Sequence, residues 1–167
     1  IYLANVISFF YLIFFTYSAY ELYKSSLIFT VFILLACIFS DIGGYVIGRT
    51  IGGKKLTKIS PNKTISGSIG SFIFSLIPII IFLLIFNLTK NHDLKINSLN
   101  QAIFLCLTLS LLSQLGDLFI SYFKRKAKVK DTGSILPGHG GVLDRIDGIL
   151  LAIPVLTLVS MLILILF

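Results

Sequence analysis

Three aspartates stand at positions where an apolar chain has little reason to place a charge. Asp144 and Asp147 are three residues apart at the expected start of a helix, so their side chains share one side of it and repel each other. Asp117 lies in the apolar run LSLLSQLGDLFISYF, where an ionised carboxylate costs about 2.5–3.5 kcal/mol. A bound cation would remove both penalties, and carboxylate oxygens suit Mg²⁺. We therefore expect Asp117, Asp144 and Asp147 to hold a metal ion at a catalytic centre, although Asp144 could also be a simple helix cap.

Asp117 belongs to a polar stripe on its expected helix. The members of the stripe follow one another at helical spacing and share one face: Ser113, Asp117, Ser121, Lys124 and Arg125. The two basic residues lie about two turns from Asp117, which is too far for a direct ion pair along the helix. Another group must therefore offset the charge of Asp117.

The segment KDTGSILPGHGGVLDRID, residues 130–147, surrounds the other two aspartates with small residues. Gly138, Gly140 and Gly141 let the backbone approach a ligand closely and offer N–H donors to it. His139 between them is a candidate for contacting a phosphate or orienting a ligand, although a lone loop histidine is more often solvated.

A second polar segment covers residues 40–71 and begins with Ser40-Asp41. Gly44 and Gly48 form a small-xxx-small pattern that favours close helix packing. Gly48 to Lys54 matches the start of a GxxxxGK phosphate loop, but lysine follows in place of Ser or Thr and no strand precedes it, so that interpretation is rejected.

Four lysines on this glycine-rich segment suit either a multiply charged anion or the headgroups of anionic lipids: Lys54, Lys55, Lys58 and Lys63. Pro61 disfavours helix at Ser60 and marks a boundary. Thr64 then stands at the start of the next apolar span, where a helix N-terminus either binds phosphate or is simply capped.

The elements that position these residues are membrane helices. Hydrophobic residues make up 56% of the chain and charged residues 13%, with a mean hydropathy of +0.99, which excludes an ordinary soluble domain. We predict an all-α, polytopic integral membrane protein with about five transmembrane helices, at residues 1–20, 27–47, 68–88, 101–123 and 148–167. The first has no basic segment or cleavage site of a signal peptide, and the start at Ile1 suggests a processed chain or a fragment.

The net charge of +7 comes mainly from the two polar segments. By the positive-inside rule both are cytoplasmic active-site loops, with the N-terminus inside and the C-terminus outside. The location of these charges argues against nucleic acid as a partner. Cys37 and Cys106 each stand alone in an apolar span and are expected to be packing residues.

Several short runs of residues in the two polar segments resemble a known protein family. The runs Ser121-Tyr122-Phe123-Lys124-Arg125, Lys130-Asp131-Thr132-Gly133-Ser134, Pro137-Gly138-His139-Gly140-Gly141 and Asp144-Arg145-Ile146-Asp147 resemble the signature of the phosphatidate cytidylyltransferases, the CDP-diacylglycerol synthases. The runs Ser40-Asp41-Ile42-Gly43-Gly44-Tyr45, Gly48-Arg49 and Ser60-Pro61-Asn62-Lys63-Thr64 are similar to an upstream segment of that family. The chain departs from the family at Ile65-Ser66-Gly67, where Trp-Glu-Gly is usual. The resemblance covers residues 25–160, so residues 1–167 look like one transmembrane cytidylyltransferase domain, the C-terminal part of the usual family chain.

The resemblance implies transfer of a cytidylyl group from CTP to phosphatidic acid in phospholipid synthesis, with Mg²⁺ required, a second cation left open, and membrane lipids as surroundings. It also implies a bacterial inner membrane, and a homodimer is left open. The catalytic set becomes Asp117, Asp144, Asp147 and Lys130. The expected substrate-binding set is Asp41, Lys55, Ser60, Lys63, Thr64, Ser121, Lys124, Arg125, Gly138, His139, Gly140, Gly141 and Arg145.

Three alternatives stand beside this interpretation. A transporter would place Asp117 on a translocation path, but polar residues should then be spread through the depth of several spans. A CDP-alcohol phosphotransferase would show a denser aspartate signature. An inactive fragment of the enzyme is the third alternative.

Overall fold

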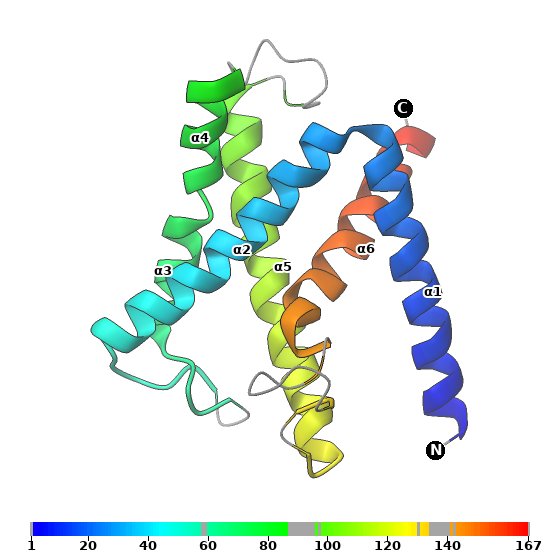
Figure 1. Ribbon diagram of the computed structural model, residues 1–167, viewed down its shortest axis with the longest axis vertical. Coiled ribbons are helices and arrows are strands. Elements are labelled where there is room, and N and C mark those ends of the chain that lie inside the picture. Colours follow the sequence, from blue (N-terminus) through cyan, green and yellow to red (C-terminus); the bar gives the residue numbers. More distant parts are fainter. Residues whose placement is uncertain are drawn as a thin grey trace.

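The computed structural model describes residues 2–57, 60–86, 96, 98–129, 131–133, 141 and 143–166. Side chains are described within these ranges except at residues 2–5, 86, 144, 145 and 162–166. The described residues form helices and no strand, which confirms the expected all-α fold (Figure 1). The helices are α1 Tyr2–Ser25, α2 Leu27–Thr50, α3 Ile65–Phe74, α4 Ile77–Phe86, α5 Leu99–Lys126 and α6 Leu143–Leu166.

The helices are long and apolar enough for a membrane protein with several spans. Four stretches of the described chain could cross a bilayer, at Val6–Ser25, Leu27–Thr50, Ile65–Ile85 and Leu99–Lys126, and α6 contains a shorter apolar stretch, Ile146–Met161. The polytopic prediction is therefore confirmed. The protein is an integral membrane protein.

One predicted span differs in detail from the structure. The span expected at residues 68–88 begins already at Ile65 and is divided into α3 and α4 by a turn at Ser75 and Leu76. Pro78 explains the break, because proline has no N–H to donate and its ring crowds the carbonyl of residue 74. The earlier start follows from Thr64, whose side chain accepts a hydrogen bond from Gly67 N at 3.1 Å and caps α3.

A second proline is accommodated differently. Pro154 lies inside α6, so the carbonyl of Leu150 has no N–H from the residue four positions later. The hydroxyl of Tyr11 in α1 donates to that carbonyl at 2.7 Å. The neighbouring helix thus satisfies the freed backbone group, as a membrane interior requires.

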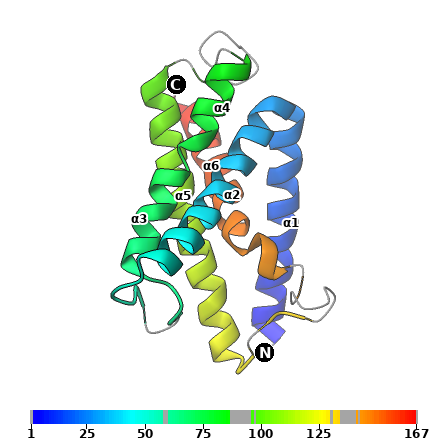
Figure 2. The same cartoon turned by 60° about the vertical axis from the view of Figure 1, so that its left-hand side comes forward.

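The helices are arranged so that α2 runs obliquely across α3 and α5, and α6 lies between α5 and α1 (Figures 1 and 2). Helix α1 begins at the end of the molecule where α2 and α5 finish, and α6 finishes at the opposite end (Figure 1). We call the first of these the loop end. Both polar loops therefore share one end of the molecule.

Glycines allow α2 and α3 to cross almost in backbone contact. A Cβ on Gly43 would lie 2.5 Å from the carbonyl oxygen of Gly70, and a Cβ on Gly67 would lie 2.7 Å from the carbonyl oxygen of Gly44. A Cβ on Gly48 would lie 3.5 Å from the Cα of Gly67. The close packing predicted for the small-residue pattern in α2 is confirmed.

The crossing of α5 and α6 is similarly tight. A Cβ on Gly116 would lie 2.8 Å from the carbonyl oxygen of Asp147 and 2.9 Å from that of Gly148. Because Asp117 follows Gly116 directly, this contact brings Asp117 of α5 close to Asp147 of α6.

The core behind these crossings is apolar. Phe32, Ile33 and Leu109 are fully buried, together with the free cysteines Cys37 and Cys106. The prediction that both cysteines are packing residues is confirmed.

Candidate active site

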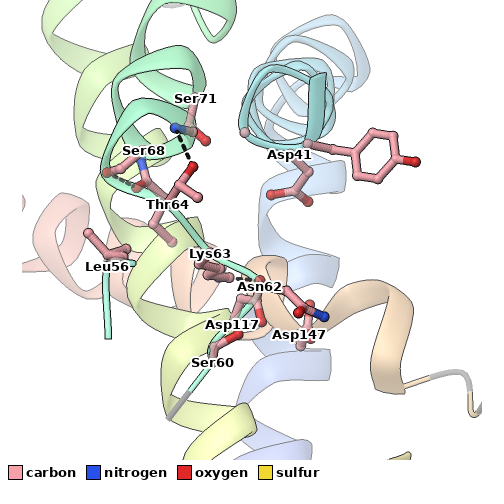
Figure 3. A pocket seen from close by; sticks show the side chains of 14 residues that line it. Asp41, Leu56, Ser60, Asn62, Lys63, Thr64, Ser68, Ser71, Asp117 and Asp147 are labelled. Carbon is pink, nitrogen blue, oxygen red and sulfur yellow. Dashed lines mark hydrogen bonds and ion pairs between the residues drawn. The ribbon is translucent and has the colours of Figure 1, made fainter. Parts of the chain in front are cut away.

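Three aspartates from three helices line one cavity of about 460 Å³. Asp41 comes from α2, Asp117 from α5 and Asp147 from α6. Figure 3 shows Asp117 and Asp147 beside Lys63 and Asn62, with Asp41 directed toward them from α2. The negative charge of Asp117 acts on both of the other carboxylates. Asp117 and Asp147 of the predicted metal-binding set thus meet at one cavity, and Asp41, predicted as a substrate-binding residue, joins them.

Lys63 is the partner that Asp117 required. Its Nζ forms an ion pair with Asp117 Oδ2, and the two side chains are 26% and 30% exposed. Ser121, one turn along α5, donates a further hydrogen bond to Asp117 Oδ1 at 3.2 Å. The charge within α5 is thus offset by a lysine from a loop far away in sequence.

The loop that carries Lys63 is held by its own backbone. The N–H of Leu56 donates to the carbonyl of Lys63 at 2.8 Å, and the N–H of Ile65 donates to the carbonyl of Lys54 at 3.0 Å. Gly52 and Gly53 have φ angles of 64° and 107°, which glycine adopts readily, and they turn the chain after α2. The capped start of α3 then fixes Lys63 over the cavity.

The other two carboxylates also have hydrogen-bonding partners. Asp147 Oδ1 accepts from Gly148 N at 2.9 Å, and Asp147 Oδ2 lies 3.9 Å from Lys124 Nζ. Asp41 Oδ1 accepts from Ser113 Oγ at 3.3 Å. Three members of the predicted polar stripe of α5 therefore contact the aspartates: Ser113, Ser121 and Lys124. Arg125, the last member of the stripe, is exposed.

One part of the cavity wall is polar but neutral, and we call it the neutral wall. Ser68 and Ser71 of α3 and Gln114 of α5 line it, and Ser68 Oγ donates to Gln114 Oε1 at 2.5 Å. These residues, together with Asn62 and Tyr45, were not predicted as site residues from the sequence. A glutamine inside an apolar span was an available signal, since such amides usually bind another helix or a ligand.

The structure brings part of the predicted site together. The predicted residues that line the cavity are Asp41, Ser60, Lys63, Thr64, Asp117 and Asp147. Thr64 lines the cavity and also caps α3, which is one of the two roles that the sequence left open for it. Ser121 and Lys124 reach the cavity through their contacts with the aspartates.

Three other predicted residues whose side chains are described do not line the cavity. Lys55 and Arg125 are exposed, and Gly141 is buried against Thr132 and Gly133, where a Cβ on Gly141 would lie 2.9 Å from Gly133 N. Asp144 and Arg145 belong to the first turn of α6, and their side chains lie outside the described part. Lys58, Lys130, Gly138, His139 and Gly140 also lie outside the described residues.

The donor set is suitable for a hard divalent cation. Among the described side chains at the cavity, three carboxylates are opposed by the ammonium groups of Lys63 and Lys124. No three His, Cys, Asp or Glu side chains in the described part of the chain are grouped tightly enough to form a complete metal site. Mg²⁺ usually takes only one or two protein carboxylates and keeps water or substrate phosphate as its other ligands, so Asp117 and Asp147 fit it.

Comparisons of the chain with known proteins give consistent matches. The model of the cytidylyltransferase family matches residues 2–163. Over 122 residues the chain is 47% identical to a phosphatidate cytidylyltransferase of Rickettsia bellii, covering 72% of this chain and 52% of that protein. It is 40% identical over 141 residues to that of Staphylococcus saprophyticus, covering 83% and 51%, and 40% identical over 129 residues to that of Bacillus subtilis, covering 75% and 45%. The chain thus spans about half the length of the curated relatives it matches.

Proposed function

The chain belongs to the cytidylyltransferase family, and from this premise we propose that it transfers a cytidylyl group from CTP to phosphatidic acid, forming CDP-diacylglycerol and pyrophosphate. The observation that carries the proposal is the convergence of Asp117, Asp147 and Lys63 in one cavity toward the loop end of the helix bundle, with Lys124 beside Asp147. The three named relatives are phosphatidate cytidylyltransferases.

The chemistry needs no protein nucleophile. A phosphate oxygen of the lipid attacks the α-phosphorus of CTP, the new P–O bond forms, and the bond to the β-phosphate bridging oxygen breaks to release pyrophosphate. Such a reaction depends on positioning and on neutralising charge. Mg²⁺ held by Asp117 and Asp147 would stabilise the negative charge of the phosphates.

The residues of the chain have distinct parts in this proposal. Lys63 pairs with Asp117 and would turn to the triphosphate when the carboxylate binds a cation. Lys124 would bind the phosphate of phosphatidic acid. Asp41 would contact the nucleotide or a second cation, and Lys130 and His139 stay predictions for phosphate contact.

The location of the site explains how two unlike substrates can meet. The loop end carries most of the basic residues, so it would face the cytoplasm of a bacterial cell, with CTP arriving from water. Phosphatidic acid would stay in the inner leaflet with its acyl chains in lipid. The ion-transport alternative loses support, because the aspartates of the cavity gather toward the loop end.

The test is a transfer assay on purified protein in detergent with labelled CTP, phosphatidic acid and Mg²⁺. We expect a lipid-soluble labelled product from the wild type and a loss of at least about a hundredfold in Asp147→Asn, since a charge that neutralises the transferring phosphates is removed. Chelating Mg²⁺ with EDTA should also stop product formation.

The matched control is Glu21→Gln, which also replaces a carboxylate by an amide. Glu21 lies near the end of α1 that is away from the loop end, so this variant should keep wild-type activity. Equal activity of Asp147→Asn and wild type would remove Asp147 from the site. A wild-type chain that forms no product with both substrates present would favour the inactive-fragment alternative.

A further inference from the structure

Gln114 lies in the neutral wall of the cavity, and its amide group is held by hydrogen bonds to two other residues. Its Oε1 accepts from Ser68 Oγ of α3 at 2.5 Å, and its Nε2 donates to Ser110 Oγ at 3.2 Å. Ser110 Oγ lies 2.8 Å from Ser40 Oγ of α2, and both of these serines are fully buried. Groups on three helices therefore hold the amide in place, and because both of its partners are hydroxyls, they can satisfy it with its oxygen and nitrogen in either arrangement.

In either arrangement one hydrogen-bond donor of Gln114 is left for a ligand. A primary amide has two N–H groups, and the bond to Ser110 uses one of them. The other has no partner among the described residues, although Gln114 lines the cavity. A donor at the wall of a cavity matches a ligand that offers a hydrogen-bond acceptor.

Gln114 also lies deeper in the membrane than Asp117. It precedes Asp117 by three residues in a helix that ends at the loop end, which places it about 4.5 Å farther from that end. Its partner Ser68 is four residues beyond the helix cap Thr64, about 6 Å inward along α3. Gln114 and Ser68 thus lie on the membrane-inward side of Asp117, at the level where Asp41 bonds to Ser113.

This depth order matches the structure of a phospholipid. When the lipid phosphate lies at the level of Asp117 and Asp147, the glycerol backbone and its two acyl esters extend toward the bilayer interior. Ester carbonyls are neutral and only accept hydrogen bonds. The nucleotide arrives from water and meets the lysines of the loop end first.

We infer that Gln114 binds a glycerol ester carbonyl of the lipid substrate and thereby selects acyl-ester lipids over ether lipids. The inference rests on the proposed function and adds a specificity residue to it. Ser68 and Ser110 are positioning residues, because they orient the amide and do not themselves contact the ester.

The test combines a change in the protein with the matching change in the lipid. Transfer is measured with diacyl phosphatidic acid and with its dialkyl ether analogue of equal chain length, in wild type and Gln114→Leu. The ether keeps the phosphate and the chains but lacks the carbonyls. We expect wild type to have a kcat/KM about threefold to tenfold higher for the ester lipid, the worth of one neutral hydrogen bond. Gln114→Leu should use both lipids equally, with an unchanged KM for CTP.

Two further variants guard against a folding defect. Ser68→Ala removes only the donor to Gln114 Oε1 and should reduce the ester preference while leaving the helix intact. Gln101→Leu makes the same substitution at the other end of α5, outside the cavity, and should keep the wild-type preference.

Three results would overturn the inference. A wild type without ester preference, or an equal loss for both lipids in Gln114→Leu, would mean that the amide only packs helices together. A changed preference between CTP and UTP with an intact ester preference would assign Gln114 to the nucleobase. A wild type inactive with every lipid contradicts the proposed function instead, so the two failures are distinguishable.

Discussion

At the residue scale, the pairing of Asp117 with Lys63 explains how a charge is tolerated within α5. Removing one partner of a shielded ion pair leaves the other uncompensated. We predict that Lys63→Met lowers the thermal stability of the ligand-free protein, because Asp117 then repels Asp41 and Asp147 without compensation. The same change in an Asp117→Asn background should be nearly neutral. The two variants should therefore be coupled by about 0.5–3 kcal/mol, measured by thermal unfolding in detergent.

The control for this cycle is Lys55→Met, which removes an exposed lysine from the same loop and should leave the unfolding temperature unchanged. Additive effects of Lys63→Met and Asp117→Asn would contradict the ion pair as the compensation of Asp117.

At the element scale, the site depends on how closely α5 approaches α6. Gly116 leaves no room for a side chain beside the carbonyl oxygens of Asp147 and Gly148. We predict that Gly116→Ala separates the two helices, destabilises the protein by about 1–3 kcal/mol and reduces transfer activity, because Asp117 and Asp147 move apart. Thermal unfolding and the transfer assay check both effects. As a control, Leu115→Ala truncates the adjacent exposed side chain and should keep the activity. Wild-type activity in Gly116→Ala would show that the helices can separate without harm to the site.

At the scale of the whole molecule, both polar loops share one end, and α1 ends at the other (Figure 1). The native cysteines are fully buried, so single added cysteines report sidedness without further changes. We predict that Lys55→Cys and Lys128→Cys react with a membrane-impermeant maleimide in inside-out vesicles, and Lys24→Cys in right-side-out vesicles, because basic loops stay cytoplasmic. Labelling of Lys55→Cys and Lys128→Cys from opposite sides would contradict the shared loop end.

The membrane helices and the polar loops were predictable from the sequence, because they depend on local properties. Hydropathy over about 20 residues marks a span, helical spacing puts Ser113, Asp117 and Ser121 on one face, and a carboxylate in an apolar run requires a partner. The break before Pro78 was not predicted, because hydropathy alone indicates one continuous span where the structure has α3 and α4.

The identity of the partners came only from the tertiary structure. The positions at which the helices cross decide which lysine pairs with Asp117 and whether Asp41 joins the other carboxylates. They also decide which part of the cavity wall Gln114 forms. Those crossings are decided by backbone contacts at Gly67 and Gly116, between residues far apart in sequence. A periodic pattern specifies the face of one helix but carries no information on the face that lies opposite, because that choice is made by packing all the helices together.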